Sequence, residues 1–389
     1  MFKKNRYYSL QEIAGETYLL PYGQSLVERR HGFALGETGL YLWEKLDHCQ
    51  NKTELIEYLT KEKGVRYDAA KDDVDNFIDQ LVKYRVITYE KKTEKIPRMV
   101  LNIANITVGL YGDPVYFYRD ELASFESRKE RIDISFTVSE SFPEFISSTV
   151  LIRAADLIVE ENKECFILRY PKQKYINEIR FTRDGKEATA YVKETGNDTD
   201  RMLIGDVLHN ALRIFFLYYA RAKGYYAIES ASIFYKDKAW LFSGPPRSGK
   251  TTHVELWKKL YGVECLNGEI NLIVVEGKNA YVYGTPWCGA SRTYTTKTCD
   301  LGGIIFLKKD EIDRVDELDQ AAKEIMIAQR MISPCWNEKM LEENLEFASS
   351  LKNLVLVCLH RCTMNFTAVG VIKQRIDESK YEYQQPQYD

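Results

Sequence analysis

The stretch SGPPRSGKTTH, residues 243–253, carries residue types at the spacing that phosphate binding requires. Two glycines separated by four residues are followed at once by a lysine and a threonine, which completes the Walker A pattern G-x-x-x-x-G-K-[S/T]. In such a P-loop the backbone N–H groups surround the phosphates, the lysine reaches the terminal phosphates, and the hydroxyl ligates Mg²⁺. The sequence therefore predicts a site for ATP and Mg²⁺ formed by Gly244, Pro245, Pro246, Arg247, Ser248, Gly249, Lys250, Thr251 and Thr252, with Thr251 as a metal ligand.

The segments around this motif fit the prediction. Residues 233–235 and 239–242 are expected to form two strands joined by a polar turn, and the second strand runs directly into Gly244. A helix with one apolar face is expected to begin at Lys250. The order strand, glycine loop, helix distinguishes a phosphate-binding loop from an ordinary glycine turn.

Two further residues after the loop are candidates for the chemistry of phosphoryl transfer. Glu269 stands where an apolar strand begins, and it would either hold Mg²⁺ or accept the proton of an attacking hydroxyl. Arg292 follows in a polar loop, where its cation would stabilise a transferring phosphoryl group. The alternatives are an exposed turn carboxylate for Glu269 and a surface charge for Arg292.

Composition limits the class of protein. The 389-residue chain has a length typical of two or three domains, and its net charge of −3 indicates no general affinity for nucleic acid or anionic membranes. There is no apolar run of transmembrane length and no secretory signal. The eight cysteines are scattered, which favours reduced thiols and a cytoplasmic location. Cys358, His360 and Cys362 resemble metal ligands in spacing, but they lie in the apolar pattern LVLVCLHRC and are expected to be core residues.

The pattern of the chain predicts its organisation. Before a charged linker at residues 91–97, strands are expected at 8–13, 17–22 and 31–35. Helices are expected at 37–46, from a cap at Asn51 or Thr53, and at 69–84, which together make an α+β, winged-helix-like unit over 1–92. Farther on, strands are expected at 100–110, 164–170 and 188–192 and a helix at 204–223, and residues 376–389 look like a polar tail.

The first unit resembles the PqqD family of peptide-recognition modules (RiPP recognition elements). The resemblance rests on LQEIAGETYLLPYG, HGFALGETGLYLWEKLDHCQNKTELIEYLTKEKGV and DNFIDQLVKYRVI. It implies that the leader of a precursor peptide adds as a strand beside 31–35 and rests against the third helix. The implied contact residues are His31, Phe33, Leu35, Phe77 and Leu81. DNA binding by a winged helix is disfavoured, because the third helix carries Asp72, Asp73, Asp75 and Asp79.

The remainder resembles the HPr kinase/phosphorylase-like family, including kinases encoded beside lasso peptides. The resemblance rests on AWLFSGPPRSGKTTHVELW, LNGE and YGTPW. It implies an α/β P-loop domain with a mixed sheet like that of phosphoenolpyruvate carboxykinase, over 97–375, with a β-rich part at 99–230 and a P-loop core at 231–375. The implied activity is phosphoryl transfer from ATP to a protein or peptide hydroxyl. Oligomers occur in this family, although no residue here indicates one.

Two positions depart from the second family. Glu229 stands where relatives carry a histidine, and Gly268-Glu269 stands where they carry one or two aspartates. Glu229 could act with Glu269 as the proton acceptor, or the two departures could mark altered activity. The intact Lys250 and Thr251 predict that nucleotide binding is kept.

These observations predict a cytoplasmic, ATP-dependent Ser/Thr-type kinase that acts on a ribosomally made precursor peptide held by its leader. Its catalytic residues would be Lys250, Glu269, Glu229 and Arg292, with Thr251 and Glu269 on Mg²⁺. The first alternative is a catalytically degenerate, nucleotide-binding scaffold that delivers the peptide to another enzyme. A small-molecule enzyme related to phosphoenolpyruvate carboxykinase is the weakest alternative, because His253 is the only histidine near the loop.

Overall fold

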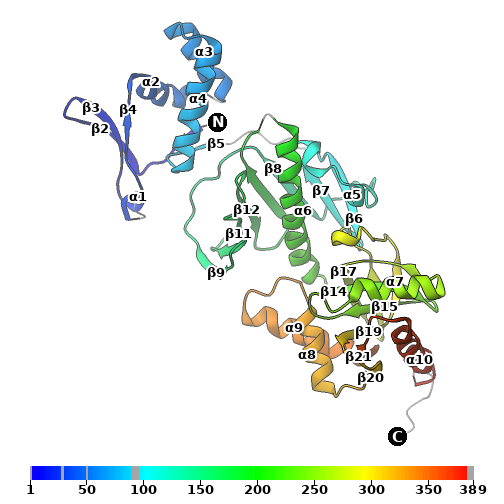
Figure 1. Cartoon of the computed structure of the whole chain (residues 1–389). Coiled ribbons are helices and arrows are strands. Elements are labelled where there is room, and N and C mark those ends of the chain that lie inside the picture. Colours follow the sequence, from blue (N-terminus) through cyan, green and yellow to red (C-terminus); the bar gives the residue numbers. More distant parts are fainter. Residues whose placement is uncertain (1, 28–29, 50, 90–95, 196, 383–389) are drawn as a thin grey trace. The chain divides into compact units, whose positions relative to one another are not determined.

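The computed structural model in Figure 1 describes residues 2–27, 30–49, 51–89, 96–195 and 197–382. The residues group into two compact units. The first comprises Met1–Ile96, Thr137–Arg180 and Thr189–Ile204, and the second comprises Pro97–Phe136, Phe181–Ala188 and Gly205–Asp389. The sequence led us to expect one boundary near residues 92–97. A boundary does fall there, but two later segments also belong to the first unit.

The beginning of the first unit is a small sheet followed by helices, as the sequence predicted. The expected strands and helices lie within about two residues of those observed, and the pairing order of the sheet is β2-β3-β4. A second, two-stranded sheet, β1 with β5, was not predicted. The elements are β1 (Phe2–Lys4), β2 (Tyr8–Ile13), β3 (Glu16–Pro21), α1 (Gln24–Val27), β4 (Phe33–Leu35), α2 (Glu37–Lys45), α3 (Lys52–Lys63), α4 (Tyr67–Lys83) and β5 (Ile87–Tyr89).

Local signals explain where these helices begin and end. The side chain of Asn51 accepts a hydrogen bond from the backbone N–H of Glu54, so Asn51 rather than Thr53 caps α3. Gly64, with φ of 66°, ends the same helix in the left-handed conformation that glycine adopts without strain.

The rest of the first unit is an antiparallel meander. Strands β9, β10 and β11 pair in sequence, and the strands that lie wholly or partly in this unit follow the order β8-β13-β12-β11-β10-β9. Their bounds are β8 (Ile134–Ser139), β9 (Thr149–Arg153), β10 (Ile158–Glu161), β11 (Cys165–Arg169), β12 (Ile176–Thr182) and β13 (Glu187–Val192).

The prediction of one continuous strand over 100–110 was wrong. The structure has a hairpin there, β6 (Met99–Ile103) and β7 (Ile106–Tyr111). Ala104 and Asn105 have φ of 49° and 64°, and two consecutive positive φ values make the tight turn whose twist suits a hairpin. The alternation of apolar residues continues through the turn, and no glycine interrupts it. The sequence pattern therefore predicted a continuous strand instead of a hairpin. The helix expected at 204–223 is α6 (Asp198–Arg221).

The second unit is built on a mixed sheet with the order β15-β14-β17-β18-β19-β21-β20. The strand β15 also pairs with β19 in parallel, as β19 does with β21, whereas the other pairs are antiparallel. The strands are β14 (Tyr225–Tyr235), β15 (Lys238–Ser243), β16 (Glu264–Cys265), β17 (Ile270–Glu276), β18 (Asn279–Tyr283), β19 (Thr298–Lys309), β20 (Arg314–Asp316) and β21 (Leu356–Cys362).

Helices cover both faces of this sheet. Along β15, Ala239 and Leu241 pack toward α8 (Gln320–Arg330) and α9 (Glu338–Leu351). The alternate residues Trp240 and Phe242 pack toward α7 (Lys250–Tyr261) and α10 (Phe366–Glu382). A buried strand whose two faces both meet helices reads as a continuous apolar run, which is why AWLF was recognisable in the sequence.

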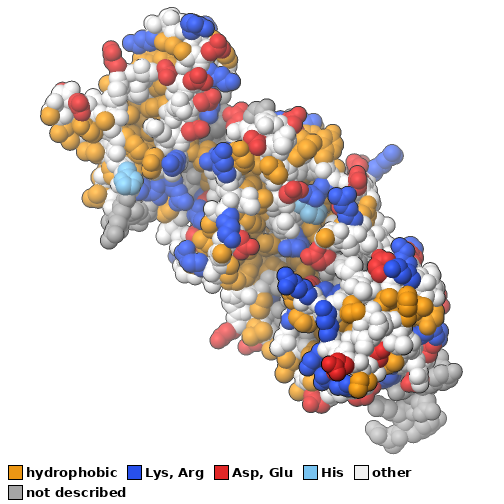
Figure 2. Space-filling view, viewed as in Figure 1, with side chains coloured by type: hydrophobic (Ala, Val, Ile, Leu, Met, Phe, Trp, Pro, Cys, Tyr) orange, Lys and Arg blue, Asp and Glu red, His pale blue; other side chains and the backbone are white. Residues whose placement is uncertain are grey.

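The end of the chain differs from the expected polar tail. Helix α10 continues to Glu382, so residues 376–382 are helical, and Ile376 is buried in the core. Residues 383–389 of the expected tail lie outside the described residues. On the face shown in Figure 2, acidic and basic side chains are interspersed. Within the described parts of the chain, no helix combines the length and the apolar character needed to cross a membrane.

Candidate functional site

The glycine loop, defined as Gly244–Gly249, connects β15 to α7 in the second unit. Its backbone turns through positive φ at Gly244, Arg247 and Gly249, with values of 149°, 64° and 99°. A Cβ at Gly249 would lie 2.7 Å from Met364 Cε, and one at Gly244 would lie 2.9 Å from the carbonyl oxygen of Leu307. Gly244 is therefore required by space as well as by conformation, because the Leu307 backbone cannot move aside, whereas Gly249 is required by its positive φ. The expected order of strand, glycine loop and helix is present.

The loop also contains an unpartnered polar group. Ser248 is buried, and its hydroxyl has no hydrogen-bond partner among the described residues. Buried polar groups nearly always have a partner, so an orphan hydroxyl in a glycine loop at a helix N-terminus suits an anion that accepts hydrogen bonds. The residues of the loop thus fit the nucleotide phosphate predicted from the sequence.

Lys250, the first residue of α7, is held at the base of the glycine loop. Its Nζ donates to Glu229 Oε1 at 2.9 Å and to the carbonyl oxygens of Gly244 and Pro245 at 3.0 and 3.4 Å. Glu229 comes from β14, and the pairing of Ser230 with Ser243 brings it to the end of β15 where the loop starts. The structure therefore brings two of the predicted catalytic residues into contact.

Thr251 and Thr252 follow in the first turn of α7, and both are exposed. Pro245, Pro246 and Arg247 are likewise exposed around the loop. The exposed hydroxyl of Thr251 is accessible beside Lys250, as a magnesium ligand would need to be.

Glu269 lies just before β17, next to β14. Its backbone oxygen accepts a hydrogen bond from Ser230 N at 2.9 Å, so the backbones of Glu229 and Glu269 belong to neighbouring strands. Its carboxylate lies against Gly289, where a Cβ would come within 1.9 Å of Glu269 Oε2. No hydrogen bond or ion pair joins Glu269 to Lys250 among the described residues.

Gly268 lies in a position without room for a side chain. A Cβ at this position would lie 1.7 Å from Ser291 Oγ and 2.7 Å from Ser291 Cβ. The Ser291 hydroxyl is itself fixed by a hydrogen bond of 2.7 Å to the carbonyl oxygen of Cys288. An aspartate cannot occupy position 268 in this structure unless the 289–291 turn moves.

Arg292 follows the 289–291 turn in the left-handed conformation, with φ of 51°, and it is exposed. Within the described residues its side chain has neither an ion pair nor a hydrogen bond. The structure places it beside the turn that covers Glu269, but no recorded contact brings it to Lys250. Its predicted catalytic role thus gains no direct geometric support.

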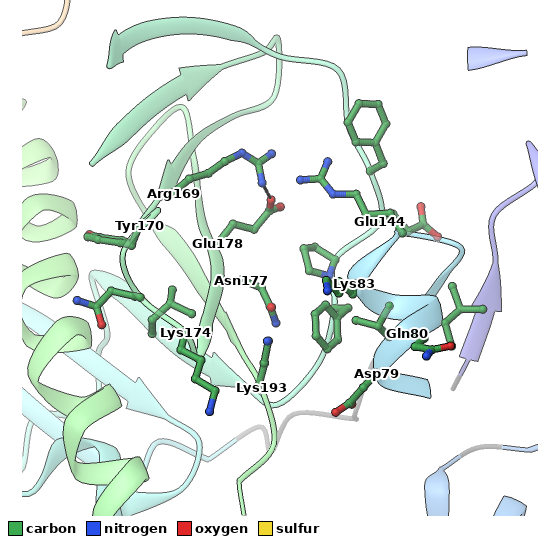
Figure 3. A pocket seen from close by; sticks show the side chains of 18 of the residues that line it. Asp79, Gln80, Lys83, Glu144, Arg169, Tyr170, Lys174, Asn177, Glu178 and Lys193 are labelled. Atoms are coloured by element: carbon green, nitrogen blue, oxygen red, sulfur yellow. Dashed lines mark hydrogen bonds and ion pairs between the residues drawn. The ribbon is translucent and has the colours of Figure 1, made fainter. Parts of the chain in front are cut away.

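A cavity of about 640 Å³ lies in the first unit, and the sequence did not predict it (Figure 3). One wall is the last turns of α4, with Asp79, Gln80 and Lys83, and the opposite wall is formed around β11 and β12. There the buried Glu178 forms ion pairs with both Arg169 and Arg180. The lining lysines Lys83, Lys174 and Lys193 form no ion pair among the described residues.

The cavity therefore presents more positive than negative charge, because the carboxylates in its lining, Asp79, Glu144 and Glu178, are outnumbered by the cations Lys83, Arg85, Arg169, Lys174, Arg180 and Lys193. Lining carboxylates are partly engaged elsewhere: Asp79 faces Lys52 at 3.5 Å, and Glu144 faces Lys3 at 3.2 Å. Such a cavity favours an anionic ligand group. Its recognition required the tertiary structure, since its walls come from segments far apart in the chain.

The predicted peptide edge is accessible at β4. This strand is the last in the order β2-β3-β4. The ring of Phe33 packs on Tyr84 at 4.8 Å between centroids, and exposed His31 lies 6.0 Å from the same ring. Tyr84 was not predicted as part of the site.

The surface predicted for the peptide, here called the groove, is formed by Phe33 and Leu35 of β4 and Phe77 of α4, which are partly buried. A Cβ at Gly39 of α2 would meet Leu35 at 3.5 Å and Phe77 at 3.6 Å, so these three residues adjoin one another. Both Leu35 and Phe77 are only partly buried. Their side chains therefore retain exposed apolar surface that a bound peptide would cover.

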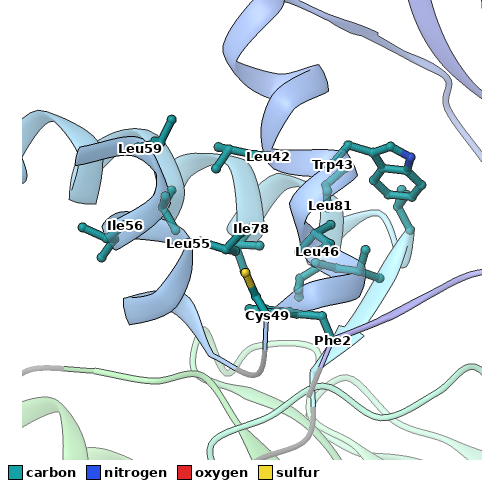
Figure 4. Packing of buried hydrophobic residues seen from close by; sticks show 14 of the residues in the cluster. Phe2, Leu42, Trp43, Leu46, Cys49, Leu55, Ile56, Leu59, Ile78 and Leu81 are labelled. Carbon is teal, nitrogen blue, oxygen red and sulfur yellow. The ribbon is translucent and has the colours of Figure 1, made fainter. Parts of the chain in front are cut away.

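Leu81 does not belong to this groove, which corrects the sequence prediction. It is 2% exposed and packs in the core with Leu42, Leu46 and Ile78 (Figure 4). Along α4, Phe77 lies nearer the groove, whereas Leu81 is one turn farther on and faces inward. The helical periodicity of the sequence predicts which residues of α4 lie on its apolar face. It does not predict which of these residues are buried in the core and which lie at its edge.

The expectation for β21 is confirmed for two cysteines: Cys358 and Cys362 are buried in the core that α7 and α10 cover. Burial raises the pKa of the Cys358 thiol to about 12 and that of Cys362 to about 11. These thiols are protonated at neutral pH.

The chain thus contains a small unit of strands and helices with an open edge strand, β4, and an α/β unit with a glycine loop. Residues 26–87 match the family model described as coenzyme PQQ synthesis protein D (PqqD). The match runs from α1 to β5, so it includes β4, α4 and Tyr84. These residues are a PqqD domain, as the sequence analysis expected. A comparison with curated proteins found no match for the chain.

Proposed function

We propose that this protein is an ATP-dependent kinase that phosphorylates a hydroxyl side chain of a ribosomally made precursor peptide. PqqD domains bind precursor peptides, which connects the chain with the biosynthesis of modified ribosomal peptides (RiPPs). The observation that carries the kinase assignment is the contact of Lys250 with Glu229 at the base of the glycine loop. A cation and a carboxylate thus meet beside the glycine loop, whose sequence pattern predicts phosphate binding.

The peptide-binding part of the proposal rests on β4 and α4. A leader segment would add as a strand along β4, with its main chain hydrogen-bonded to the free edge and its apolar side chains on Phe33, Leu35 and Phe77. An acidic segment of the same leader would enter the cavity lined by Lys83, Lys174 and Lys193.

In the second unit, MgATP would supply the phosphoryl group when bound. Lys250 would turn from the carbonyl oxygens of Gly244 and Pro245 toward the phosphates and neutralise their charge. Thr251 would hold Mg²⁺ through its exposed hydroxyl. Glu229 would keep the ammonium group of Lys250 in place.

We assign the proton acceptor to Glu269 rather than to Glu229. The carboxylate of Glu229 is already occupied by Lys250 at 2.9 Å and would serve to hold that lysine. No cation pairs with Glu269 in the described structure. Loss of a general base typically lowers the rate about 10²- to 10⁴-fold, so Glu269→Gln should lose turnover by this factor and keep ATP affinity.

The deciding experiment is intact-mass measurement on the short precursor peptide encoded beside this gene, incubated with the protein and MgATP. Wild type and the control Lys259→Ala, an exposed lysine on the same helix, should add one phosphate to the peptide. Lys250→Ala should add none. Phosphorylation by Lys250→Ala at the wild-type rate would overturn the assignment of the glycine loop.

The second candidate is a nucleotide-binding scaffold without turnover. It is favoured by the same ion pair, because Glu229 stands in place of a family histidine and engages the lysine. For such a scaffold, MgATP would raise the melting temperature of wild type but not of Lys250→Ala, and the peptide mass would stay unchanged.

A further inference from the structure

Three side chains with metal-binding atoms converge beneath the glycine loop, at a place where the sequence predicted only core. They are His253 in the first turn of α7 and His360 and Cys362 at the end of β21. Their exposed fractions are 1%, 0% and 1%, and their ligand atoms all lie within 4.8 Å of one another. Cys358, although it is on the same strand, is not part of the cluster.

Each of the two histidines has a buried ring nitrogen without a hydrogen-bond partner among the described residues. The rings meet edge-on, with centroids 5.3 Å apart. Nε2 of His253 and Nε2 of His360 are buried and have no hydrogen-bond partner among the described residues. Buried polar atoms without partners are rare in folded proteins, so this pair needs an explanation.

His360 has the arrangement of a metal-binding histidine. Its Nδ1 lies 3.3 Å from the carbonyl oxygen of Arg314. A ring that donates through Nδ1 to a carbonyl keeps its lone pair on Nε2, which is how metal-binding histidines are oriented in proteins. The unpartnered atom is therefore the one able to bind a metal.

Metal binding at this cluster would also be coupled to proton release. The Cys362 thiol would lose its proton to solvent when its sulfur binds the metal, so binding releases one proton.

The nearby carboxylate of Asp313 is already engaged and does not complete the set. Its oxygens accept hydrogen bonds from the backbone N–H of Thr363 at 2.6 Å and from the hydroxyl of Thr367 at 2.6 Å. The available donors are thus two imidazoles and one sulfur, a set that suits borderline-soft ions such as Zn²⁺ rather than Mg²⁺ or Ca²⁺.

We propose that His253, His360 and Cys362 form a zinc site that ties α7 to β21. Zinc bonds of about 2.0–2.3 Å require the three ligand atoms to approach one another more closely than 4.8 Å, a movement that side-chain rotation supplies. The three protein ligands leave one position for water or a small ligand.

The position of the site links it to the glycine loop. The backbone N–H of His253 donates to the carbonyl oxygen of Gly249 at 2.8 Å. Met364, two residues after Cys362, packs against the same glycine. A metal bound here would fix both sides of Gly249, whether or not the chain is a kinase, so the site is independent of the proposed function.

The test is metal binding to the full-length protein after treatment with a chelator. Zinc competition with a chromophoric chelator should show about one tightly bound Zn²⁺ per chain. Replacement by Co²⁺ should give a sulfur-to-cobalt charge-transfer band and the intense visible absorption of tetrahedral cobalt. The exposed Cys335→Ser variant should keep both signals, which excludes adventitious binding at that thiol.

Variants identify the ligands. Cys362→Ser should lose the charge-transfer band, and His253→Gln should lower zinc affinity at least tenfold. Cys358→Ser, a buried thiol on the same strand, is the matched control and should bind zinc like wild type. Circular dichroism verifies that each variant is folded. Wild type that takes up no Zn²⁺ and shows no charge-transfer band would overturn the proposal without any variant, and an unchanged band in folded Cys362→Ser would also do so.

Discussion

Gly268 shows how a single residue limits the chemistry of the second unit. The space that a side chain at position 268 would need is filled by Ser291, so Glu269 is the carboxylate on this segment. The absence of a side chain at 268 is a packing requirement of the 289–291 turn. The catalytic assignment therefore has to rest on Glu269 and Glu229 alone.

This packing gives a prediction for stability. Gly268→Ala should lower the free energy of unfolding by about 1–3 kcal/mol, because the added methyl group forces the fixed Ser291 side chain away. The double variant Gly268→Ala/Ser291→Gly should recover part of that loss, which thermal and urea unfolding would measure. Gly370→Ala is the control, because its Cβ meets nothing within 4 Å in α10 and should stabilise the helix slightly. Equal stability of Gly268→Ala and wild type would contradict the packing argument.

His209 on α6 gives a prediction for pH. Burial, with Arg119 and Arg213, lowers its pKa from 6.5 to about 3, so the folded protein keeps it neutral. The unfolded chain binds a proton near pH 6.5, and stability is therefore lost as the pH falls from 6.5 toward 3. The slope is at most about 1.4 kcal/mol per pH unit from this group.

Urea unfolding at pH 7, 6 and 5 checks this expectation. His209→Gln should reduce the loss of stability between pH 6.5 and 5, whereas His48→Gln, at an exposed position, should follow the wild-type curve. An unchanged pH dependence in His209→Gln would show that the ring is not held neutral by the fold.

At the scale of elements, β4 and α4 together form the edge proposed to bind the peptide. The strand leaves a free edge, and the helix presents Phe77 beside Leu35 with Gly39 between them. Leu81, one turn along α4, serves the core instead. The buried residues of α4, such as Leu81, thus stabilise the domain. Phe77, at the boundary of the core, leaves part of its surface free for a peptide.

The prediction at this scale concerns Phe77. Phe77→Ala should weaken leader binding about 10- to 100-fold, because a partly exposed aromatic ring at the centre of a groove behaves as a binding hot spot. Fluorescence anisotropy with a labelled leader peptide measures the affinity. Ile13→Ala, which removes a side chain 50% exposed on β2, should change it less than twofold. Equal affinities of the two variants would move the leader away from this groove.

At the scale of the whole molecule, a PqqD domain and a unit with a glycine loop share one chain. If the leader is held by the first unit, the core peptide meets the second unit at an effective concentration of about millimolar, set by the peptide between them. Tethering explains the joining of the two functions without any fixed arrangement of the units.

The corresponding prediction concerns a peptide cut from its leader. At micromolar peptide, removal of the leader should lower the phosphorylation rate about 100-fold, because the tether is lost. Free leader added in excess should not restore the rate, and it should inhibit phosphorylation of the intact precursor. Full restoration by free leader would instead indicate that the leader activates the second unit.

The sequence by itself determined the local features of this protein. The glycine loop was predictable because phosphate binding fixes residue types at short spacing, and the helices of the PqqD domain were predictable because their caps and apolar periods are local. Asn51, Gly64 and the strand before Gly244 all act through neighbours in the chain. The hairpin turn at Ala104-Asn105 was missed because Asn105 is its only turn-favouring residue and it stands between apolar neighbours.

Only the tertiary structure decided which distant residues meet. The pairing of β14 with β15 brings Glu229 to Lys250, packing removes Leu81 from the groove, and β21 brings His360 and Cys362 to His253. The cavity beside α4 likewise depends on segments far apart in the sequence. Long-range contacts of this kind depend on the order of strands in the sheet and on the packing of the core. Both depend on the whole chain, so a short stretch of residues does not predict them.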